Sequence, residues 1–204
     1  MTKLYWRKIY YSLSLLLLLF VSSCSTPVSQ YYVLNTIAMN ASDSAHVQQN
    51  NALQISIRQL EIPRYLDRPR IVTRDADNHL RISEYHQWGG RLRDDLSRTL
   101  SDNLAQYLGS VGVRTAPFQG SMQADISLFI DIRQFELLAD GRVHLKVRWH
   151  VQRRTEEMLS YFDHIIADTD VGERDFAAIA ASMSHVLAEF SKRIALVVGA
   201  KEIR

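Results

Sequence analysis

Cysteine is almost absent from this chain: a single cysteine, Cys24, stands among 204 residues. One cysteine excludes an intramolecular disulfide, so packing alone must hold a folded domain together. It also excludes the paired cysteines of zinc ribbons and dithiol redox sites, which need at least a Cys-x-x-Cys spacing. The place of Cys24, close to the amino terminus, therefore needs another explanation.

The motifs of common enzyme classes are missing as well. The sequence contains no Gly-x-Ser-x-Gly, no His-Glu-x-x-His and no glycine-rich phosphate loop. His144 and His150 fall on the same face of one predicted strand, but at about 3.3 Å per residue they lie about 20 Å apart, too far to share a metal. Asp163 and His164 are strand neighbours that face opposite ways, which argues against a catalytic dyad. We therefore expect no catalysis, no metal and no cofactor.

Long hydrophobic runs are limited to one short segment near the amino terminus. Three basic residues precede an apolar stretch at residues 9–21, an arrangement typical of a secretory signal peptide. The stretch is shorter than the ~20 apolar residues that a membrane-spanning helix needs. The sequence thus predicts an exported protein without a transmembrane helix.

The predicted signal peptide ends in Val21-Ser22-Ser23-Cys24, which resembles a bacterial lipobox. In a lipobox the cysteine thiol takes a diacylglyceryl group and becomes the new amino terminus, so we expect residues 1–23 to be removed and Cys24 to carry acyl chains such as palmitate. Buried acyl chains, at ~0.8 kcal/mol per CH₂, give a stable anchor. The alternative, a plain signal peptide with an incidental cysteine, leaves an odd thiol in an exported chain. Ser25, where inner-membrane lipoproteins of enteric bacteria carry Asp, favours sorting to the outer membrane.

A strong charge of one sign is lacking too. The formal net charge is +2 for the full chain. The predicted cleavage removes Lys3, Arg7 and Lys8 and no acidic residue, so the mature chain is slightly acidic. Binding to nucleic acid rests on neutralisation of phosphates by Lys and Arg. We therefore expect no nucleic-acid partner.

Alternating apolar and polar residues predict several strands. They are expected at residues 31–34, 53–57, 71–73, 79–82, 126–132, 143–151 and 161–167. The alternation slips at residues 59–62, which predicts a bulge, and Asp140-Gly141 predicts a hairpin turn. The strand at residues 143–151 has one apolar face; its other face is expected to be cationic and solvated, with His144, Lys146, Arg148 and His150.

Two segments have helical spacing. Leucines recur every four residues at Leu92, Leu96, Leu100, Leu104 and Leu108, and a second apolar stripe runs over residues 176–197. We expect both stripes to pack on a core rather than to offer a groove to a partner. The order of strands, helix, strands and helix predicts an α+β fold, with a mainly antiparallel sheet and both helices on one face.

One block of sequence resembles a known family. The run Ile62-Pro63-Arg64-Tyr65-Leu66-Asp67-Arg68-Pro69, together with the lipobox, Tyr31-Tyr32-Val33-Leu34, Trp88 and the leucine-striped helix, is similar to the PqiC-like ABC-type transport auxiliary lipoproteins. The likeness covers essentially the whole mature chain. One departure is Gly89-Gly90 after Trp88, where helix-compatible residues are expected. The start of the helix should therefore be shifted or kinked.

The resemblance implies an outer-membrane lipoprotein that faces the periplasm. Residues 24–30 would be a lipidated tether and residues 31–204 one domain, with a fold similar to the amino-terminal domain of TolB. The implied role is to dock a Pqi-type machine, in which an inner-membrane protein and a tunnel-forming MCE-domain protein (PqiB-like) carry lipid between membranes, and so to support membrane integrity. Because such a tunnel is rotationally symmetric, a homo-oligomeric ring of the lipoprotein is a further expectation. The alternative is a stand-alone lipid-binding or envelope-assembly lipoprotein.

The candidate partner-binding residues are Tyr65, Leu66 and Arg68, in the loop at residues 63–69, and Trp88. Two prolines stiffen the loop, which lowers the entropy lost on docking. An aromatic side chain beside arginines is also a common composition at binding hot spots. The alternative is that Tyr65 and Leu66 plug one end of the core.

Overall fold

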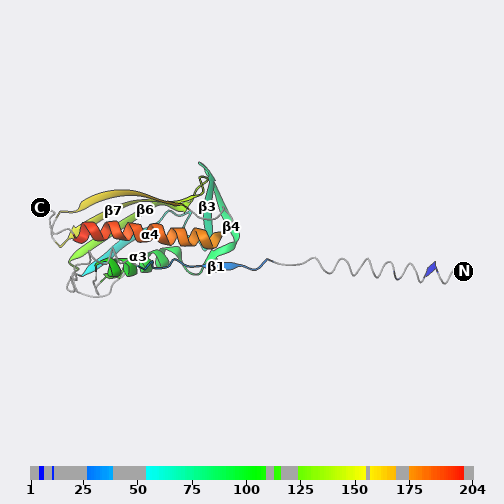
Figure 1. The fold of residues 1–204 in the computed structure, drawn as a ribbon, viewed down its shortest axis with the longest axis horizontal. Coiled ribbons are helices and arrows are strands. Elements are labelled where there is room, and N and C mark those ends of the chain that lie inside the picture. Colours follow the sequence, from blue (N-terminus) through cyan, green and yellow to red (C-terminus); the bar gives the residue numbers. More distant parts are fainter. Residues whose placement is uncertain are drawn as a thin grey trace.

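The computed structural model describes residues 5–6, 11, 27–38, 54–108, 113–115, 124–154, 157–168 and 175–199. They form an α+β domain in which two helices pack against a mixed sheet (Figure 1). Cys24, the cleavage site before it and the polar segment at residues 40–51 lie outside the described residues. Lipidation of Cys24 therefore stays a prediction.

Each predicted strand and helix has a counterpart in the structure. The strands are β1 (Gln30–Tyr32), β2 (Ile55–Glu61), β3 (Arg70–Ala76), β4 (His79–Trp88), β5 (Val113–Thr115), β6 (Ile126–Leu137), β7 (Arg142–Arg153) and β8 (Leu159–Asp168). The helices are α3 (Leu92–Leu108) and α4 (Phe176–Gly199). Neither of these two helices has the length and apolar character needed to cross a membrane.

The expectation of a mainly antiparallel sheet was wrong. Short connections make β3–β4, β6–β7 and β7–β8 antiparallel, but β2 runs parallel to both β5 and β6, and β1 runs parallel to β4. The physical reason is the length of the connections. The chain between β2 and β6 includes the β3–β4 hairpin and α3, which is long enough to return β6 in the same direction as β2.

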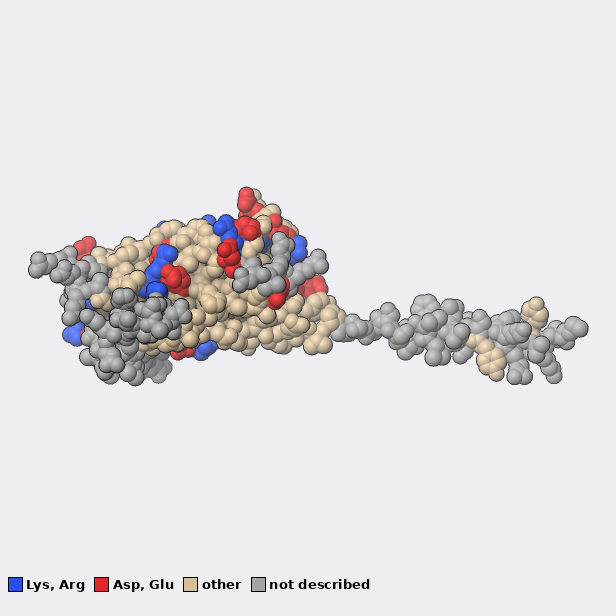
Figure 2. All heavy atoms as spheres, viewed as in Figure 1, with Lys and Arg blue, Asp and Glu red and all other residues tan. Residues whose placement is uncertain are grey.

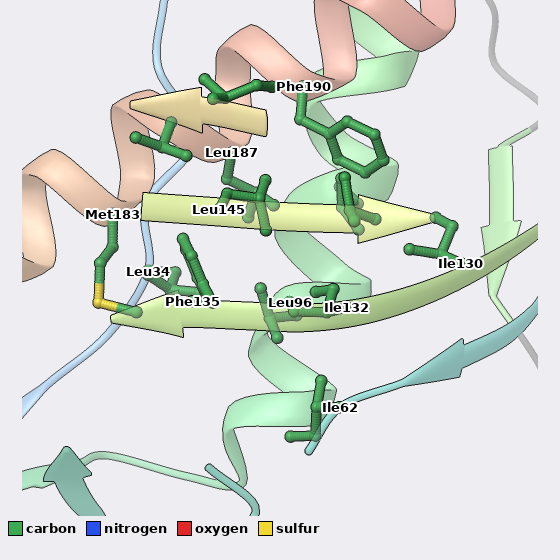
Figure 3. Packing of buried hydrophobic residues seen from close by; sticks show 14 of the residues in the cluster. Leu34, Ile62, Leu96, Ile130, Ile132, Phe135, Leu145, Met183, Leu187 and Phe190 are labelled. Carbon is green, nitrogen blue, oxygen red and sulfur yellow. The ribbon is translucent and has the colours of Figure 1, made fainter. Parts of the chain in front are cut away.

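Apolar side chains between the helices and the sheet form one core (Figure 3). Leu96, Leu100 and Leu104 of α3 are fully buried, as predicted for the leucine stripe. On α4, Phe190 meets the ring of Trp149 edge-on, with the ring centroids 6.1 Å apart. Both helical stripes are therefore core, and the two helices also contact each other.

The predicted bulge and hairpin turn are both present. The β2–β6 register shifts between Ile57 and Gln59, close to the predicted position. Gly141 has φ +76°, a left-handed conformation that glycine adopts without steric cost. It lies in the turn that joins β6 to β7.

Gly89 and Gly90 separate β4 from α3. The Gly89 N–H donates to the Tyr32 carbonyl at 2.7 Å, and a Cβ on Gly89 would come within 3.1 Å of the Val33 side chain. Glycine thus permits close approach of β4 to β1. As the departure from the family pattern predicted, the helix starts only after this pair, at Leu92.

Candidate partner-binding site

The loop at residues 63–69 folds as a tight turn against the body of the domain. The Leu66 N–H donates to the Pro63 carbonyl at 2.9 Å, and the Arg68 N–H donates to the Leu66 carbonyl at 2.8 Å. At the far end of the loop, the Trp88 N–H donates to the Pro69 carbonyl at 2.7 Å. The prolines and these bonds give the loop a defined conformation.

The four predicted contact residues do not share one environment. Leu66 and Trp88 are buried in the core, with 3% and 4% of their surfaces exposed. A buried side chain is not available to a partner on the surface, so the structure corrects the prediction for these two and favours the core plug for Leu66. Tyr65 and Arg68 are half-buried. That a partner contacts this loop stays a prediction. Its candidate contact residues are Tyr65, Arg68 and the exposed Arg64.

Tyr65 belongs to a polar network around the fully buried carboxylate of Glu136 on β6. The Tyr65 hydroxyl donates to Glu136 Oε2 at 2.9 Å. Arg74, on β3, donates from Nε to Oε1 at 3.0 Å, and its Nη2 also lies 3.0 Å from Oε1. The Gln134 amide and the Phe135 N–H complete the set at 3.1 and 3.0 Å. Both carboxylate oxygens are therefore engaged by protein donors.

This environment shifts the titration of the groups around Glu136. Burial raises the pKa of the Tyr65 phenol, and the adjacent Glu136 charge raises it further. Burial alone would lower the pKa of the Arg74 guanidinium, but the hydrogen bond and charge of Glu136 outweigh that effect and raise it. These shifts keep the Tyr65 phenol protonated as a donor and the Arg74 guanidinium charged, so the network joins the loop, β3 and β6.

Sequence reasoning missed Glu136. Its burial follows from a register shift of β6 against β7 between Ile132 and Gln134, after which Phe135, Glu136 and Leu137 are all buried. The shift places Glu136 under the loop while Phe135 stays in the main core. The one signal in the sequence is an acid within the apolar run Phe135-Glu136-Leu137-Leu138.

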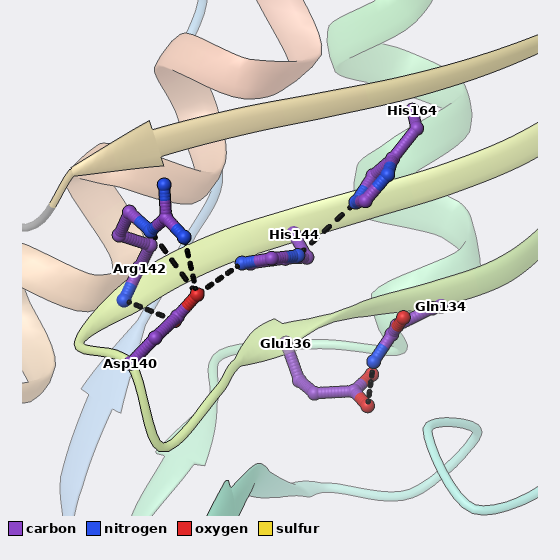
Figure 4. A network of polar contacts seen from close by, with 6 residues as sticks. All are labelled: Gln134, Glu136, Asp140, Arg142, His144 and His164. Carbon is purple, nitrogen blue, oxygen red and sulfur yellow. Dashed lines mark hydrogen bonds and ion pairs between the residues drawn. The ribbon is translucent and has the colours of Figure 1, made fainter.

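The face of β7 that was predicted to be cationic and solvated is only partly so. His144 is buried, with 6% of its surface exposed, because its ring lies between two polar partners. Its Nε2 is 2.9 Å from Asp140 Oδ2, and its Nδ1 is 3.1 Å from His164 Nε2 on β8 (Figure 4). Arg148 is exposed as expected, but so are the apolar side chains of Phe162 and Ile166 on the neighbouring strand.

The electrostatics of this histidine pair point to a structural role. His164 is exposed on β8, but partial desolvation of its ring lowers its pKa, and the charges of Lys146 and His144 lower it further. Burial would raise the pKa of Asp140, but hydrogen bonds from Arg142 and His144 outweigh it and hold that pKa below its usual range. On the opposite face of β8, Asp163 binds the Trp149 Nε1–H at 2.8 Å, so Asp163 and His164 do point apart as predicted. In the described part of the chain, no three His, Cys, Asp or Glu side chains form a cluster that could hold a metal.

Charges of both signs are mixed on the surface. In Figure 2, blue and red atoms alternate over the β3–β4 hairpin, and much of the face that includes α4 is uncharged. Many of the surface charges are paired locally, as in the 2.8 Å contact between Arg93 and Asp67 of the loop. Among the described residues on this face, charges of one sign form no extended patch.

One family model matches most of the chain. It is described as the ABC-type transport auxiliary lipoprotein component and matches residues 32–195. That range contains the loop, the Glu136 network and the histidine pair, and all strands after β1.

Solved structures share the fold at low sequence identity. A crystal structure of an uncharacterized protein has a TM-score of 0.67 at 19% identity and covers 84% of this chain and 99% of that chain. A Xanthomonas campestris protein of family DUF330 has a TM-score of 0.68 at 18% identity and covers 84% and 97%. A PelC dodecamer from Paraburkholderia phytofirmans reaches a TM-score of only 0.41 at 9% identity, over 70% of this chain and 87% of that chain. No curated protein sequence matches this chain.

Proposed function

Because this chain belongs to the ABC-type transport auxiliary lipoprotein components, we propose that it is a non-catalytic subunit of an envelope transport system. In this proposal it is a PqiC-like lipoprotein of the outer membrane. It docks the periplasmic tunnel of an MCE-domain protein (PqiB-like) to that membrane, and thereby supports lipid transport and membrane integrity. The observation that carries the proposal is the match to the family over residues 32–195.

The anchor in this proposal is Cys24. Its place after Val21-Ser22-Ser23 supports lipidation and cleavage, and Ser25 supports an outer-membrane location. Intact-mass measurement of the membrane-extracted protein tests this. We expect a chain that begins at an acylated Cys24, and no acylation in the Cys24→Ala variant. An unmodified Cys24, or cleavage at another position, would contradict it.

The polar groups that the structure describes support a role without chemistry. The Glu136 carboxylate, which an enzyme could use as a base, accepts hydrogen bonds from Tyr65, Arg74, Gln134 and the Phe135 N–H. His144 is held between Asp140 and His164. Each group serves the fold rather than facing an open site.

The docking surface we propose includes the exposed part of the loop at residues 63–69. Arg64 is exposed and Arg68 half-exposed on a stiff turn, so their replacement should leave the fold intact. We expect Arg64→Glu with Arg68→Glu to weaken recovery of the MCE protein, using protein tagged after Arg204 in detergent-solubilised envelopes. Arg58→Glu, an exposed arginine on β2, is the matched control.

The outcome of the same purification separates the two candidate roles. Recovery of an MCE-domain protein supports the adaptor. Repeated recovery of the lipoprotein alone with stoichiometric phospholipid would support the stand-alone carrier instead. Native mass measurement of the purified complex also tests the proposed ring, for which the exposed side chains on β7 and β8, such as Arg148 and Phe162, are candidate contacts.

A further inference from the structure

Exposed apolar and aromatic side chains gather at the end of the domain where the chain from Cys24 enters. Tyr31 on β1 is 66% exposed and Val33, just after it, 47%; Tyr85 on β4 is 39% exposed. Val28, between Cys24 and β1, is 82% exposed. Figure 1 shows β1 and the β3–β4 hairpin at this end, opposite to the end reached by the carboxyl terminus of α4.

Strand pairing places these side chains together. Tyr31 pairs with Gln87 in the parallel β1–β4 ladder, and Gln87 pairs with Arg70 in the antiparallel β3–β4 ladder. Paired residues on neighbouring strands point to the same face, so Tyr31, Gln87 and Arg70 share one face. The register of β3 against β4 shifts between Arg70 and Val72, so we place Tyr85, two residues before Gln87, on this surface from its exposure and not from strand alternation. We call this surface, formed by Tyr31, Val33, Arg70, Tyr85 and Gln87, the Tyr31 face.

The opposite face of the same strands is fixed to the body of the domain. The Tyr32 hydroxyl lies 2.8 Å from His86 Nδ1. The His86 ring stacks on Phe176, the first residue of α4, with the centroids 3.9 Å apart and the planes at 8°. The Tyr31 face therefore has a defined orientation relative to both helices.

The chain to the anchor is too short to carry this face far from the membrane. An extended chain spans at most ~3.6 Å per residue, so Val28 lies within about 14 Å of Cys24 and Tyr31 within about 25 Å. An acylated Cys24 lies at the membrane surface, where the headgroup layer alone is about 5–8 Å thick. Any bend in the tether shortens the distance between Tyr31 and Cys24 further.

We propose that the Tyr31 face lies on the phospholipid surface that holds the acyl chains of Cys24. Tyrosine is enriched at membrane–water interfaces because its ring is apolar and its hydroxyl is polar. Arg70, which is exposed and makes no ion pair with any described residue, would meet lipid phosphates at the edge of this face. The inference rests on the lipidation of Cys24 in the proposed function, but not on the transport role.

One consequence concerns the docking loop. Because the Trp88 N–H binds the Pro69 carbonyl, the loop at residues 63–69 lies beside the Tyr31 face. A partner on that loop would therefore contact the domain close to the bilayer.

Site-specific labelling of the full lipidated protein tests the inference. Because Cys24 is the only cysteine and its thiol is acylated, the variant Tyr31→Cys offers a single free thiol for an environment-sensitive fluorophore. The probe surface is vesicles of phosphatidylethanolamine and phosphatidylglycerol, and the readout is quenching by aqueous iodide. Gln30→Cys and Leu196→Cys are matched controls: Gln30 is the neighbour of Tyr31 on the opposite face, and Leu196 is an exposed apolar residue on the last turns of α4.

We expect the Tyr31→Cys label to be quenched several-fold less than both control labels, with Tyr85→Cys behaving like Tyr31→Cys. Flotation with the vesicles is measured first. Protein that floats but shows equal quenching at Tyr31, Gln30 and Leu196 would overturn the inference and leave the anchor intact. Protein that does not float would overturn the anchor, and the inference with it. Equal protection at Tyr31 and Gln30, with only Leu196 quenched, would show that the short tether holds the domain near the membrane without docking the Tyr31 face. That result would also overturn the inference.

Discussion

Two regions of this domain, the helix–sheet core and the junction of the loop at residues 63–69, are held together by different interactions. Where α3 and α4 pack on β6 and β7, the contacts are apolar, and Leu96, Leu100, Phe135 and Phe190 are fully buried. Where the loop at residues 63–69 and β3 meet the end of β6, a buried carboxylate with several donors makes the junction. The comparison shows how one sheet supports both an apolar core and a loop fixed by polar contacts.

The difference has an energetic meaning. Apolar burial is non-directional and tolerates small shifts, whereas a buried carboxylate costs free energy unless each of its oxygens is paired. The helix–sheet core should therefore determine the overall stability, and the Glu136 network should determine where the loop lies. The following predictions test this division.

The largest effect is expected in the helix–sheet core. Leu100→Ala removes a fully buried side chain and should lower the free energy of unfolding by about 2–5 kcal/mol. Urea denaturation of the soluble domain from Ser25 onward measures this. Leu196→Ala, at a site that is 62% exposed, is the control and should change stability by no more than ~0.5 kcal/mol. An unchanged midpoint for Leu100→Ala would place the leucine stripe outside the core.

A smaller and more local effect is expected at the junction of the loop. Glu136→Gln keeps the shape of the side chain but faces an amide N–H₂ toward the donors of Tyr65, Arg74 or Phe135, and should cost about 1.5–3 kcal/mol. Hydrogen exchange should increase first at residues 63–76, before the helices are affected. Glu189→Gln on the surface of α4, where the side chain is 50% exposed, is the matched control. Uniform loss of protection across the domain would show that the two regions are not separable.

The contribution of the loop alone is smaller again. Tyr65→Phe removes one hydrogen bond to Glu136 while the contacts of Arg74 remain, so we expect a loss of about 0.5–1.5 kcal/mol. Tyr85→Phe, on the Tyr31 face, should be neutral in the same thermal or urea denaturation. A double variant with Glu136→Gln should cost less than the sum of the two single changes, because both act on one network.

The smallest effect concerns pH. The folded-state pKa of His164 lies below its usual value of 6.5, so the folded protein resists protonation of this ring. The stability due to neutral His164 is therefore fully present above about pH 6.5 and is lost as the pH falls through that value toward the depressed folded pKa. His164→Gln should flatten the dependence of the unfolding midpoint on pH below about pH 6.5. An identical pH profile for wild type and His164→Gln would contradict this assignment.

The sequence predicted the repeating parts of this structure well. Period-two alternation located the strands, and the leucine spacing located α3 at Leu92–Leu108, because these periods follow directly from strand and helix geometry. Asp140-Gly141 predicted the hairpin turn for a similarly local reason, which the positive φ of Gly141 bears out. The family of the chain was also recognisable from the loop at residues 63–69 and the elements around it.

Local sequence patterns could not predict the direction of strand pairing or the burial of single polar residues. Nothing in the alternation of β2 shows that it pairs parallel with β6, because both pairing directions present the same side chains to the core. The burial of Leu66 and Trp88, the carboxylate of Glu136 beneath Tyr65 and the Tyr31 face each depend on segments far apart in the sequence. The sequence by itself determined which residues are apolar and at what period they recur. Only the tertiary structure decided which polar groups are paired and which apolar groups stay exposed, because both depend on long-range contacts and not on neighbours in the chain.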